Sequence, residues 1–219
     1  MISLDLRGVG GSSRTDHGHR VARYASDVAE LIEQLDLRDV TLVGWSLGYS
    51  MSLAYLDLRG EGRLSQLVLV EGSPKLISDD EWSFGSCDMP TGLKTVSGIP
   101  DGDYNAFVEG LTRGMYNDAD SDPEFGALLA DAVATDPNAM ARLLWNHLTQ
   151  DWRDVLPYIG IPTLVVGGTN SRIVSWRASE YTANTIPGAR LELFEGAGHA
   201  VQRERPDKVT DLLRTFVAS

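Results

Sequence analysis

Three short runs rich in Val and Leu are apolar on both faces, which restricts them to the interior of a sheet that is covered from both sides. They are residues 40–44, 67–70 and 163–166. Strands of this kind are typical of parallel sheets, whose crossover helices cover both faces. Two further runs with partial alternation, residues 2–5 and 191–194, predict weaker strands.

Amphipathic segments separate these strands and predict helices. Residues 24–35 carry apolar side chains on one helical stripe, and residues 47–58 and 208–217 are also predicted to be helical. Strands that alternate with helices predict an α/β fold, with a mostly parallel sheet between flanking helices.

The strand pattern stops between residues 78 and 156. This stretch predicts only helices, at residues 104–115, 124–133 and 138–148. Functional insertions concentrate in loops at one end of such a sheet. We therefore predict a core of residues 1–77 and 157–219 with a helical cap, or lid, of residues 78–156. The alternative is a separate small helical domain, although no linker composition flanks the stretch.

Composition and charge exclude several classes of function. The 219 residues include 31 Asp and Glu against 19 Lys and Arg, a net charge of −12. A field of that sign repels phosphate backbones and anionic lipid, so neither nucleic acid nor a membrane surface is an expected partner. The single cysteine, Cys87, excludes an intramolecular disulfide framework and a multi-cysteine metal site.

The sequence also shows no pattern typical of a membrane helix or of a signal peptide. No apolar run approaches the ~20 residues that a membrane helix needs. The first residues carry an acid within their apolar stretch and no basic segment, unlike a signal peptide. We expect a soluble, cytoplasmic protein, and the sequence does not indicate its oligomeric state.

The sequence Gly44-Trp45-Ser46-Leu47-Gly48 directly follows one predicted strand and opens a predicted helix. A serine at such a turn indicates a nucleophile elbow, in which a strained backbone exposes the hydroxyl and the glycines clear room for strand and helix. The helix N-terminus favours developing negative charge, so the Leu47 N–H is a candidate oxyanion donor. The alternative is a turn with only a structural role.

A histidine follows the last predicted strand in the sequence Gly196-Ala197-Gly198-His199. On a glycine-rich loop, His199 could reach the tip of a neighbouring strand. There it would take the Ser46 proton as general base and return it to the leaving group. A lone surface histidine is the alternative. His147 falls on an apolar helical stripe and is predicted to be a core or lid histidine.

These motifs together resemble the α/β-hydrolase superfamily over almost the whole chain, least well in the cap. The resemblance rests on Asp5-Leu-Arg-Gly8 through Ser12, Tyr24 to Asp27, Gly44 to Gly48, Ile161-Pro-Thr-Leu164 and Gly198-His199. It implies an α/β-hydrolase fold with a helical cap, structural roles for Asp5 and Arg7, and no metal or organic cofactor.

The resemblance also implies an acid partner for the histidine, usually in the loop after Val166. That loop reads Gly168-Thr-Asn-Ser171 and has no carboxylate. Glu71, after the strand at 67–70, is the predicted substitute, because some hydrolases of the superfamily, including a haloalkane dehalogenase branch, carry the acid there. A serine nucleophile argues against dehalogenation itself. Glu71 could instead be a capping or surface acid, with the role passing to Asp151 or Asp154.

The superfamily core has eight strands, whereas five are predicted here. The sequence starts inside the family's Asp-Leu-Arg-Gly strand. In the family, another strand and a His-Gly loop that supplies a second oxyanion donor come before that strand in the chain, and neither has a counterpart here. The resemblance therefore implies a fold that lacks its first strands. We favour the hypothesis that the chain is a fragment. The alternative is that the remaining strands pair directly with each other in place of the missing one.

The motifs predict a serine hydrolase of the EC 3.1 type, acting on carboxylic esters or related acyl substrates through Ser46, Glu71 and His199. A small, uncharged, apolar ester is the expected substrate. Trp45, Trp82 and Trp145 are predicted to line its pocket, unless such side chains only pack the cap onto the sheet. A cofactor-free perhydrolase or haloperoxidase-like activity would use the same residues. A non-catalytic binding protein is the third hypothesis, because the oxyanion loop is missing.

Overall fold

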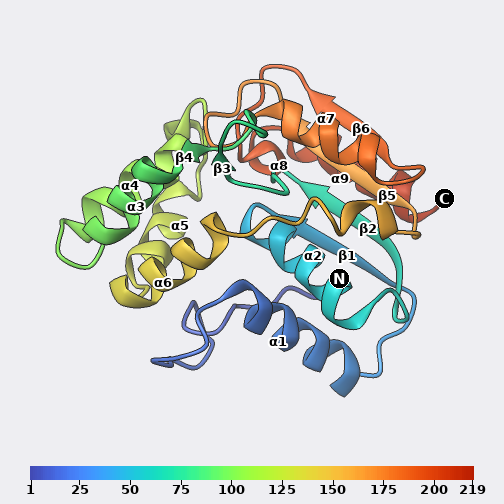
Figure 1. Cartoon of the computed structure of the whole chain (residues 1–219), viewed down its shortest axis with the longest axis horizontal. Coiled ribbons are helices and arrows are strands. Elements are labelled where there is room, and N and C mark those ends of the chain that lie inside the picture. Colours follow the sequence, from blue (N-terminus) through green and yellow to red (C-terminus); the bar gives the residue numbers. More distant parts are fainter.

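The computed structural model describes residues 1–219, and a four-stranded parallel sheet forms its centre (Figure 1). Its strands lie side by side in the order β1 (Val40–Trp45), β2 (Leu64–Val70), β5 (Thr163–Gly168) and β6 (Arg190–Phe194). Each contains one of the predicted strands, so the parallel α/β arrangement is confirmed.

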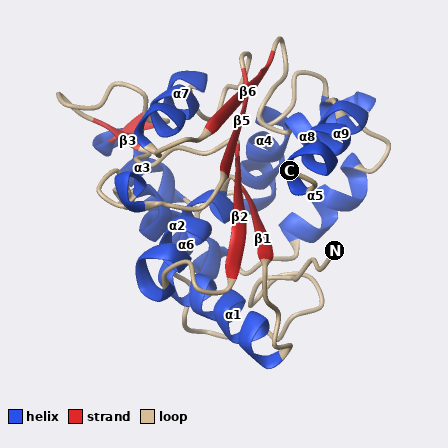
Figure 2. Ribbon diagram, turned by 90° about the vertical axis from the view of Figure 1, so that its right-hand side faces the viewer, coloured by secondary structure: helices blue, strands red, loops and turns tan.

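Alternate residues of β2 face opposite sides of the sheet, and each side has its own apolar cluster. Leu67 and Leu69 pack with α1 (Val21–Gln34) and α2 (Leu47–Arg59). Val68 and Val70 pack with the opposite layer, formed by α8 (Val201–Glu204) and α9 (Pro206–Val217). Figure 2 shows the strands between these two layers. Burial on both faces is the physical reason for the continuous apolar runs in the sequence.

The predicted helices at 24–35, 47–58 and 208–217 are confirmed as α1, α2 and α9, whereas α7 (Trp176–Thr185) was not predicted. The buried face of α7 consists of small or polar side chains, namely Ala178, Ser179, Thr182 and Ala183. Such a face produces no stripe of large apolar residues, which is the pattern that identifies a surface helix from sequence.

Residues 78–156 are mostly helical and gather on one side of the molecule in Figure 1. The elements of this region are β3 (Ile77–Ser78), β4 (Cys87–Asp88), α3 (Met89–Gly98), α4 (Tyr104–Gly114), η1 (Ala119–Ser121), α5 (Phe125–Val133) and α6 (Pro137–Leu148), and η2 (Leu156–Tyr158) follows. The three predicted helices correspond to α4, α5 and α6. Helix α3 was missed, although Asp88 caps it by accepting from the Thr91 N–H at 2.9 Å. The division into core and cap stays a prediction.

The strand predicted at residues 2–5 is wrong. These residues form no strand, and Ile2 is 56% exposed. One outer strand of the sheet is β1, where Val43 is half exposed, and residues 2–5 do not pair with it. An extended segment needs a neighbour for its backbone N–H and C=O groups before it can form a stable strand. The main sheet therefore has four strands, and residues 2–5 do not pair with its edge.

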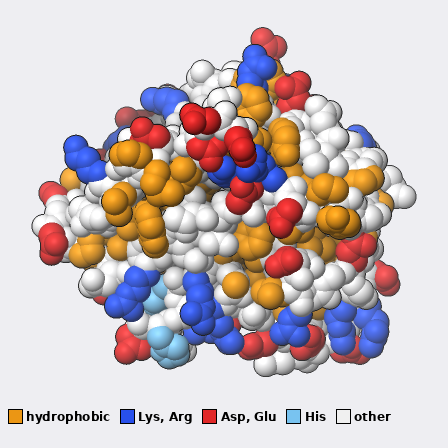
Figure 3. Space-filling model, in the orientation of Figure 1, with side chains coloured by type: hydrophobic (Ala, Val, Ile, Leu, Met, Phe, Trp, Pro, Cys, Tyr) orange, Lys and Arg blue, Asp and Glu red, His pale blue; other side chains and the backbone are white.

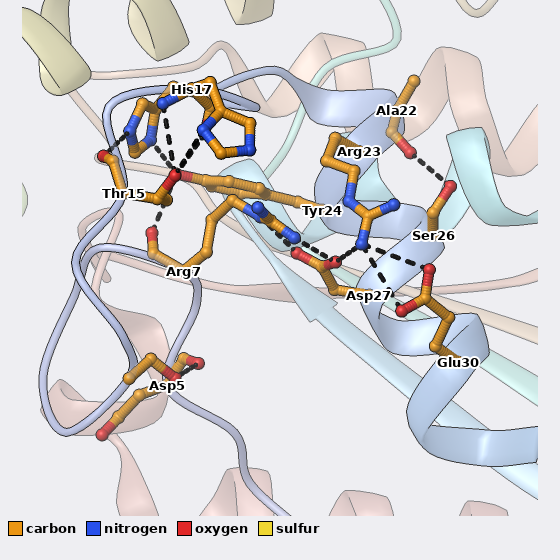
Figure 4. A network of polar contacts seen from close by, with 12 residues as sticks. Asp5, Arg7, Thr15, His17, Ala22, Arg23, Tyr24, Ser26, Asp27 and Glu30 are labelled. Atoms are coloured by element: carbon orange, nitrogen blue, oxygen red, sulfur yellow. Dashed lines mark hydrogen bonds and ion pairs between the residues drawn. The ribbon is translucent and has the colours of Figure 1, made fainter. Parts of the chain in front are cut away.

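Side chains, rather than a sheet, hold the first residues in place (Figure 4). The Arg7 guanidinium donates two hydrogen bonds to the Asp27 carboxylate of α1, at 2.7 and 2.6 Å. The Tyr24 hydroxyl donates to the Arg7 carbonyl at 3.2 Å, and the Asp5 carboxylate accepts from the Gly11 N–H at 2.8 Å. Asp5 and Arg7 thus have the structural contacts that the family resemblance implies.

None of the helices combines the length and the apolar character that crossing a bilayer requires.

Candidate functional site

Three of the predicted site residues come from different strands and meet at one edge of the sheet. Ser46 follows β1, Glu71 follows β2, and His199 lies in the loop between β6 and α8. Because the strands are parallel, their carboxyl ends lie at the same edge, which is where open α/β sheets bind ligands.

Ser46 occupies a strained turn between β1 and α2. Its φ of 54° with ψ of −112° is rare for a residue other than glycine. A Cβ on Gly44 would collide with the backbone of Gly48, so the strand and the helix can approach this closely only with glycine at position 44. A Cβ on Gly48 would meet open space. The prediction that both glycines clear room is therefore correct for Gly44 and wrong for Gly48.

His199 contacts both of the other residues. Its Nε2 lies 2.8 Å from the Ser46 Oγ, and its Nδ1 lies 3.0 Å from the Glu71 Oε2. Both His199 and Glu71 are completely buried. Since a carboxylate only accepts, the neutral ring carries its proton on Nδ1 and leaves Nε2 to accept from the Ser46 hydroxyl. This arrangement can take a proton from Ser46 and stabilise the imidazolium that results.

The Glu71 carboxylate has two hydrogen-bond donors. Its Oε1 accepts from the Gly168 N–H at the end of β5, and its Oε2 faces His199. Burial of a carboxylate is costly unless such donors compensate for lost water. The residue after it, Gly72, is also required, because a Cβ there would collide with the Tyr49 ring of α2.

The loop after β5 supplies no carboxylate but contacts the loop that carries His199. The Thr169 Oγ1 accepts from the Gly196 N–H at 2.8 Å, and the Asn170 N–H donates to the Ala197 carbonyl at 2.9 Å. A Cβ on Gly168 would collide with that same carbonyl. Residues 168–170 therefore support the His199 loop through hydrogen bonds and close packing.

The two alternative acids lie away from His199. Asp151 pairs with Arg153 at 2.7 Å and lies 3.7 Å from the Lys75 Nζ. Asp154 is exposed. Neither forms a hydrogen bond or ion pair with His199, so of the predicted acids the structure brings only Glu71 to the histidine.

Leu47 and Trp45 flank Ser46 on either side. Leu47 is the first residue of α2, and an N–H at that position has no acceptor within its own helix. Trp45 lies beside His199, with ring centroids 5.5 Å apart, and its Nε1 donates to the His199 carbonyl at 2.9 Å. Trp45 thus contacts the histidine loop, while its role in a substrate pocket stays a prediction.

The other two predicted pocket residues pack within the protein. Trp82 lies edge-on to the rings of Phe84 and Tyr181, and its Nε1 donates to the Lys75 carbonyl at 2.8 Å. Trp145 packs against the apolar cluster that joins α3 to α6. Neither forms a hydrogen bond or ring contact with Ser46 or His199, and their predicted role in a pocket also stays a prediction.

A second Ser–His contact lies one helical turn from the first. The Nε2 of His147, on α6, is 3.0 Å from the Oγ of Ser50, and Ser50 is four residues after Ser46 on α2. Burial and the nearby charge of His199 lower the pKa of His147 to about 4. The sequence predicted a core or lid histidine at position 147, but no local pattern predicts a contact across 97 residues.

We expect a His147→Gln variant to lose part of the acid sensitivity of the fold. In the unfolded chain the histidine pKa is near its ordinary 6.5, so between pH 6.5 and about 4 the unfolded state binds more protons. The free energy of unfolding of the native chain therefore falls as the pH drops through this window. Urea denaturation at several pH values measures the slope for each variant.

The exposed His17 supplies the control for this experiment. A His17→Gln variant should keep the slope of the native chain. Equal slopes for the native chain and His147→Gln would contradict the assignment of that acid sensitivity to His147.

The chain is similar in sequence to proteins of one large family. The family model described as "Alpha/beta hydrolase family" matches residues 1–212. A "Non-heme haloperoxidase" of Rhodococcus erythropolis is 30% identical, with the match covering 100% of this chain and 82% of that protein.

Solved structures resemble the whole chain as well. An esterase from Exiguobacterium antarcticum matches with a TM-score of 0.92 at 27% identity, and a bromoperoxidase from Bacillus anthracis matches with a TM-score of 0.92 at 26% identity. Each match covers 98% of this chain and 80% of the other one. The relatives thus include both esterases and haloperoxidases.

Proposed function

Because the chain belongs to the alpha/beta hydrolase family, we propose that it is a serine hydrolase acting on carboxylic esters or related acyl substrates. The observation that carries this proposal is the continuous series of contacts from Glu71 through His199 to Ser46. The strained turn at Ser46, which presents its hydroxyl to His199 at the edge of the sheet, supports the same roles.

In the proposed reaction, the Ser46 Oγ attacks the ester carbonyl while His199 Nε2 takes its proton. Glu71 keeps the ring oriented and stabilises the imidazolium charge. His199 then gives the proton to the leaving alcohol, so that an acyl group remains on Ser46. Water attacks this acyl group with His199 again as base, releasing the acid and restoring the Ser46 hydroxyl. The Leu47 N–H is proposed as one donor to the transient oxyanion.

A second candidate function is suggested by the haloperoxidases among the relatives. In a cofactor-free perhydrolase, hydrogen peroxide instead of water attacks the same acyl group on Ser46 and releases a peracid. Measuring peracid in the ester assay with and without added peroxide separates the two functions.

We also propose that residues 78–156 form a cap over the edge of the sheet where Ser46 lies. The contact between His147 of α6 and Ser50 of α2 supports this proposal, because it joins that region to the helix that begins at Ser46. Trp45, Trp82 and Trp145 remain the proposed lining of an apolar pocket beneath it.

A fluorophosphonate probe should label the native chain at Ser46. The probe reacts with an activated serine without needing the natural substrate, so Ser46→Ala should abolish labelling. Ser50→Ala is the matched control, since Ser50 of α2 also lies beside a histidine, His147 of α6, and should not carry the label. Intact mass and peptide mapping give the site. Equal labelling of Ser46→Ala would remove Ser46 from the mechanism.

Glu71→Gln should lower kcat on a p-nitrophenyl ester by about 10³–10⁴-fold. The amide has one acceptor oxygen for the two N–H donors of His199 and Gly168, and it cannot balance an imidazolium charge. Glu192→Gln, an exposed change on β6, serves as the control. A Glu71→Gln variant that keeps most of its kcat would assign the acid role to another residue.

A series of p-nitrophenyl esters should show a preference for uncharged apolar acyl groups. Lengthening the acyl chain by one methylene in an apolar pocket changes kcat/KM by about tenfold or more, and the net charge of −12 disfavours an anionic acyl group. Ser46→Ala corrects for background hydrolysis. Fastest turnover of an anionic ester, or rates independent of acyl size, would refute an apolar pocket.

A further inference from the structure

Glu204 makes three hydrogen bonds beside the site that the proposed mechanism does not use. It lies at the end of α8, five residues after His199. Its Oε2 accepts from the Gly198 N–H at 2.8 Å and from the Asn117 Nδ2 at 2.9 Å, and its Oε1 accepts from the Asn117 N–H at 2.6 Å. One carboxylate therefore joins the residue before His199 to the segment between α4 and η1.

That segment and its neighbours hold the histidine loop at further points. The Asn117 Nδ2 also donates to the Gly196 carbonyl at 2.9 Å, and the Ala200 N–H donates to the Met115 carbonyl at 2.9 Å. A Cβ on Gly198 would lie 3.0 Å from both the Glu204 Oε1 and the Met115 carbonyl. Glycine at position 198 therefore lets the loop lie this close to Glu204 and Met115 without a shift of either.

The ring of His199 must satisfy two contacts at once, 2.8 Å to Ser46 and 3.0 Å to Glu71. The loop backbone that carries the ring leaves the sheet at the end of β6, so its position depends on contacts with other segments. Among the groups that bond to residues 196–200, Glu204 supplies the only carboxylate that accepts a backbone N–H. Hydrogen bonds to a charged group are stronger than those between neutral groups.

We propose that Glu204, together with Asn117, is a positioning residue for His199. Glu204 contacts no reacting atom, and it acts by fixing the backbone of Gly198 and joining it to Asn117. This inference rests on the proposed function, because it assigns Glu204 a role in a reaction that His199 performs. A displacement of about 1 Å in a group that positions the chemistry lowers the rate by about 10²-fold.

Glu204→Gln tests this role. The amide replaces one acceptor oxygen by an NH₂ group that faces an N–H donor, so at least one of the three hydrogen bonds is lost. We expect kcat on a p-nitrophenyl ester to fall by about 10- to 10²-fold while KM stays within about twofold of the native value. The rate of fluorophosphonate labelling at Ser46 should fall in parallel. Thermal unfolding is measured alongside.

Glu195→Gln is the matched control, because Glu195 lies in the same loop, is exposed and makes no side-chain hydrogen bond or ion pair. Asn117→Ala gives a second route to the answer if Glu204→Gln does not fold. It removes the three side-chain bonds of Asn117, to Gly196, Glu204 and Asn170, but keeps its backbone N–H bond to Glu204. A smaller loss of kcat is therefore expected. The double variant should lose less than the product of the two single effects, since both residues act in one network.

Three results would overturn the proposal, and one would overturn the proposed function instead. A Glu204→Gln variant with native kcat and native labelling removes the positioning role. A change confined to KM also removes it. So does a shift in the pH midpoint of kcat/KM at an unchanged maximum, because a misplaced His199 ring lowers the maximal rate, whereas the loss of the Glu204 charge alone moves only the midpoint. Absence of labelling in the native chain, by contrast, would refute the serine hydrolase function itself.

Discussion

A carboxylate without any exposed surface, shared between a ring nitrogen and a backbone N–H, is the interaction on which the site depends. Glu71 is tolerated in the interior only because Gly168 and His199 both face it. The end of β5 must therefore lie next to Glu71, and the histidine loop must pack closely against that end. Gly168 allows both contacts, because its N–H donates to Glu71 and because a side chain at this position would collide with the Ala197 carbonyl.

Hydrogen bonds between strands place the serine and the acid relative to each other. The Ser46 N–H donates to the Val70 carbonyl at 3.0 Å, and the Glu71 N–H donates to the Val166 carbonyl at 2.8 Å. These bonds continue the ladders of β1 with β2 and of β2 with β5. With the acid after β2, the loop after β5 carries neutral side chains that support the histidine loop, as Thr169 does with Gly196.

The sequence alone predicted the strands of the sheet and the residues of the site, because these features follow from local hydrophobic patterns and from the order of the motifs. Apolar runs on both faces predicted three strands of the sheet, and partial alternation predicted the fourth. Two motifs and the family resemblance predicted which side chains would meet at its edge. The strand predicted at residues 2–5 failed because a strand needs a neighbour, which alternation cannot reveal. The contact of Glu204 with Asn117 spans 87 residues, and that of His147 with Ser50 spans 97. Contacts at such separations depend on how the helices pack and leave no local periodicity.

The three residues of the site are held by parts of the fold that differ in their exposure to solvent. Glu71 follows β2, whose residues 67–70 are buried, and Ser46 follows the outer strand β1, whereas the bonds around Asn117 and Glu204 reach the surface. Segments held by exposed contacts open locally at temperatures where the rest of a protein stays folded. On heating, the hydrogen bonds around Asn117 and Glu204 are therefore expected to open before those that hold Glu71.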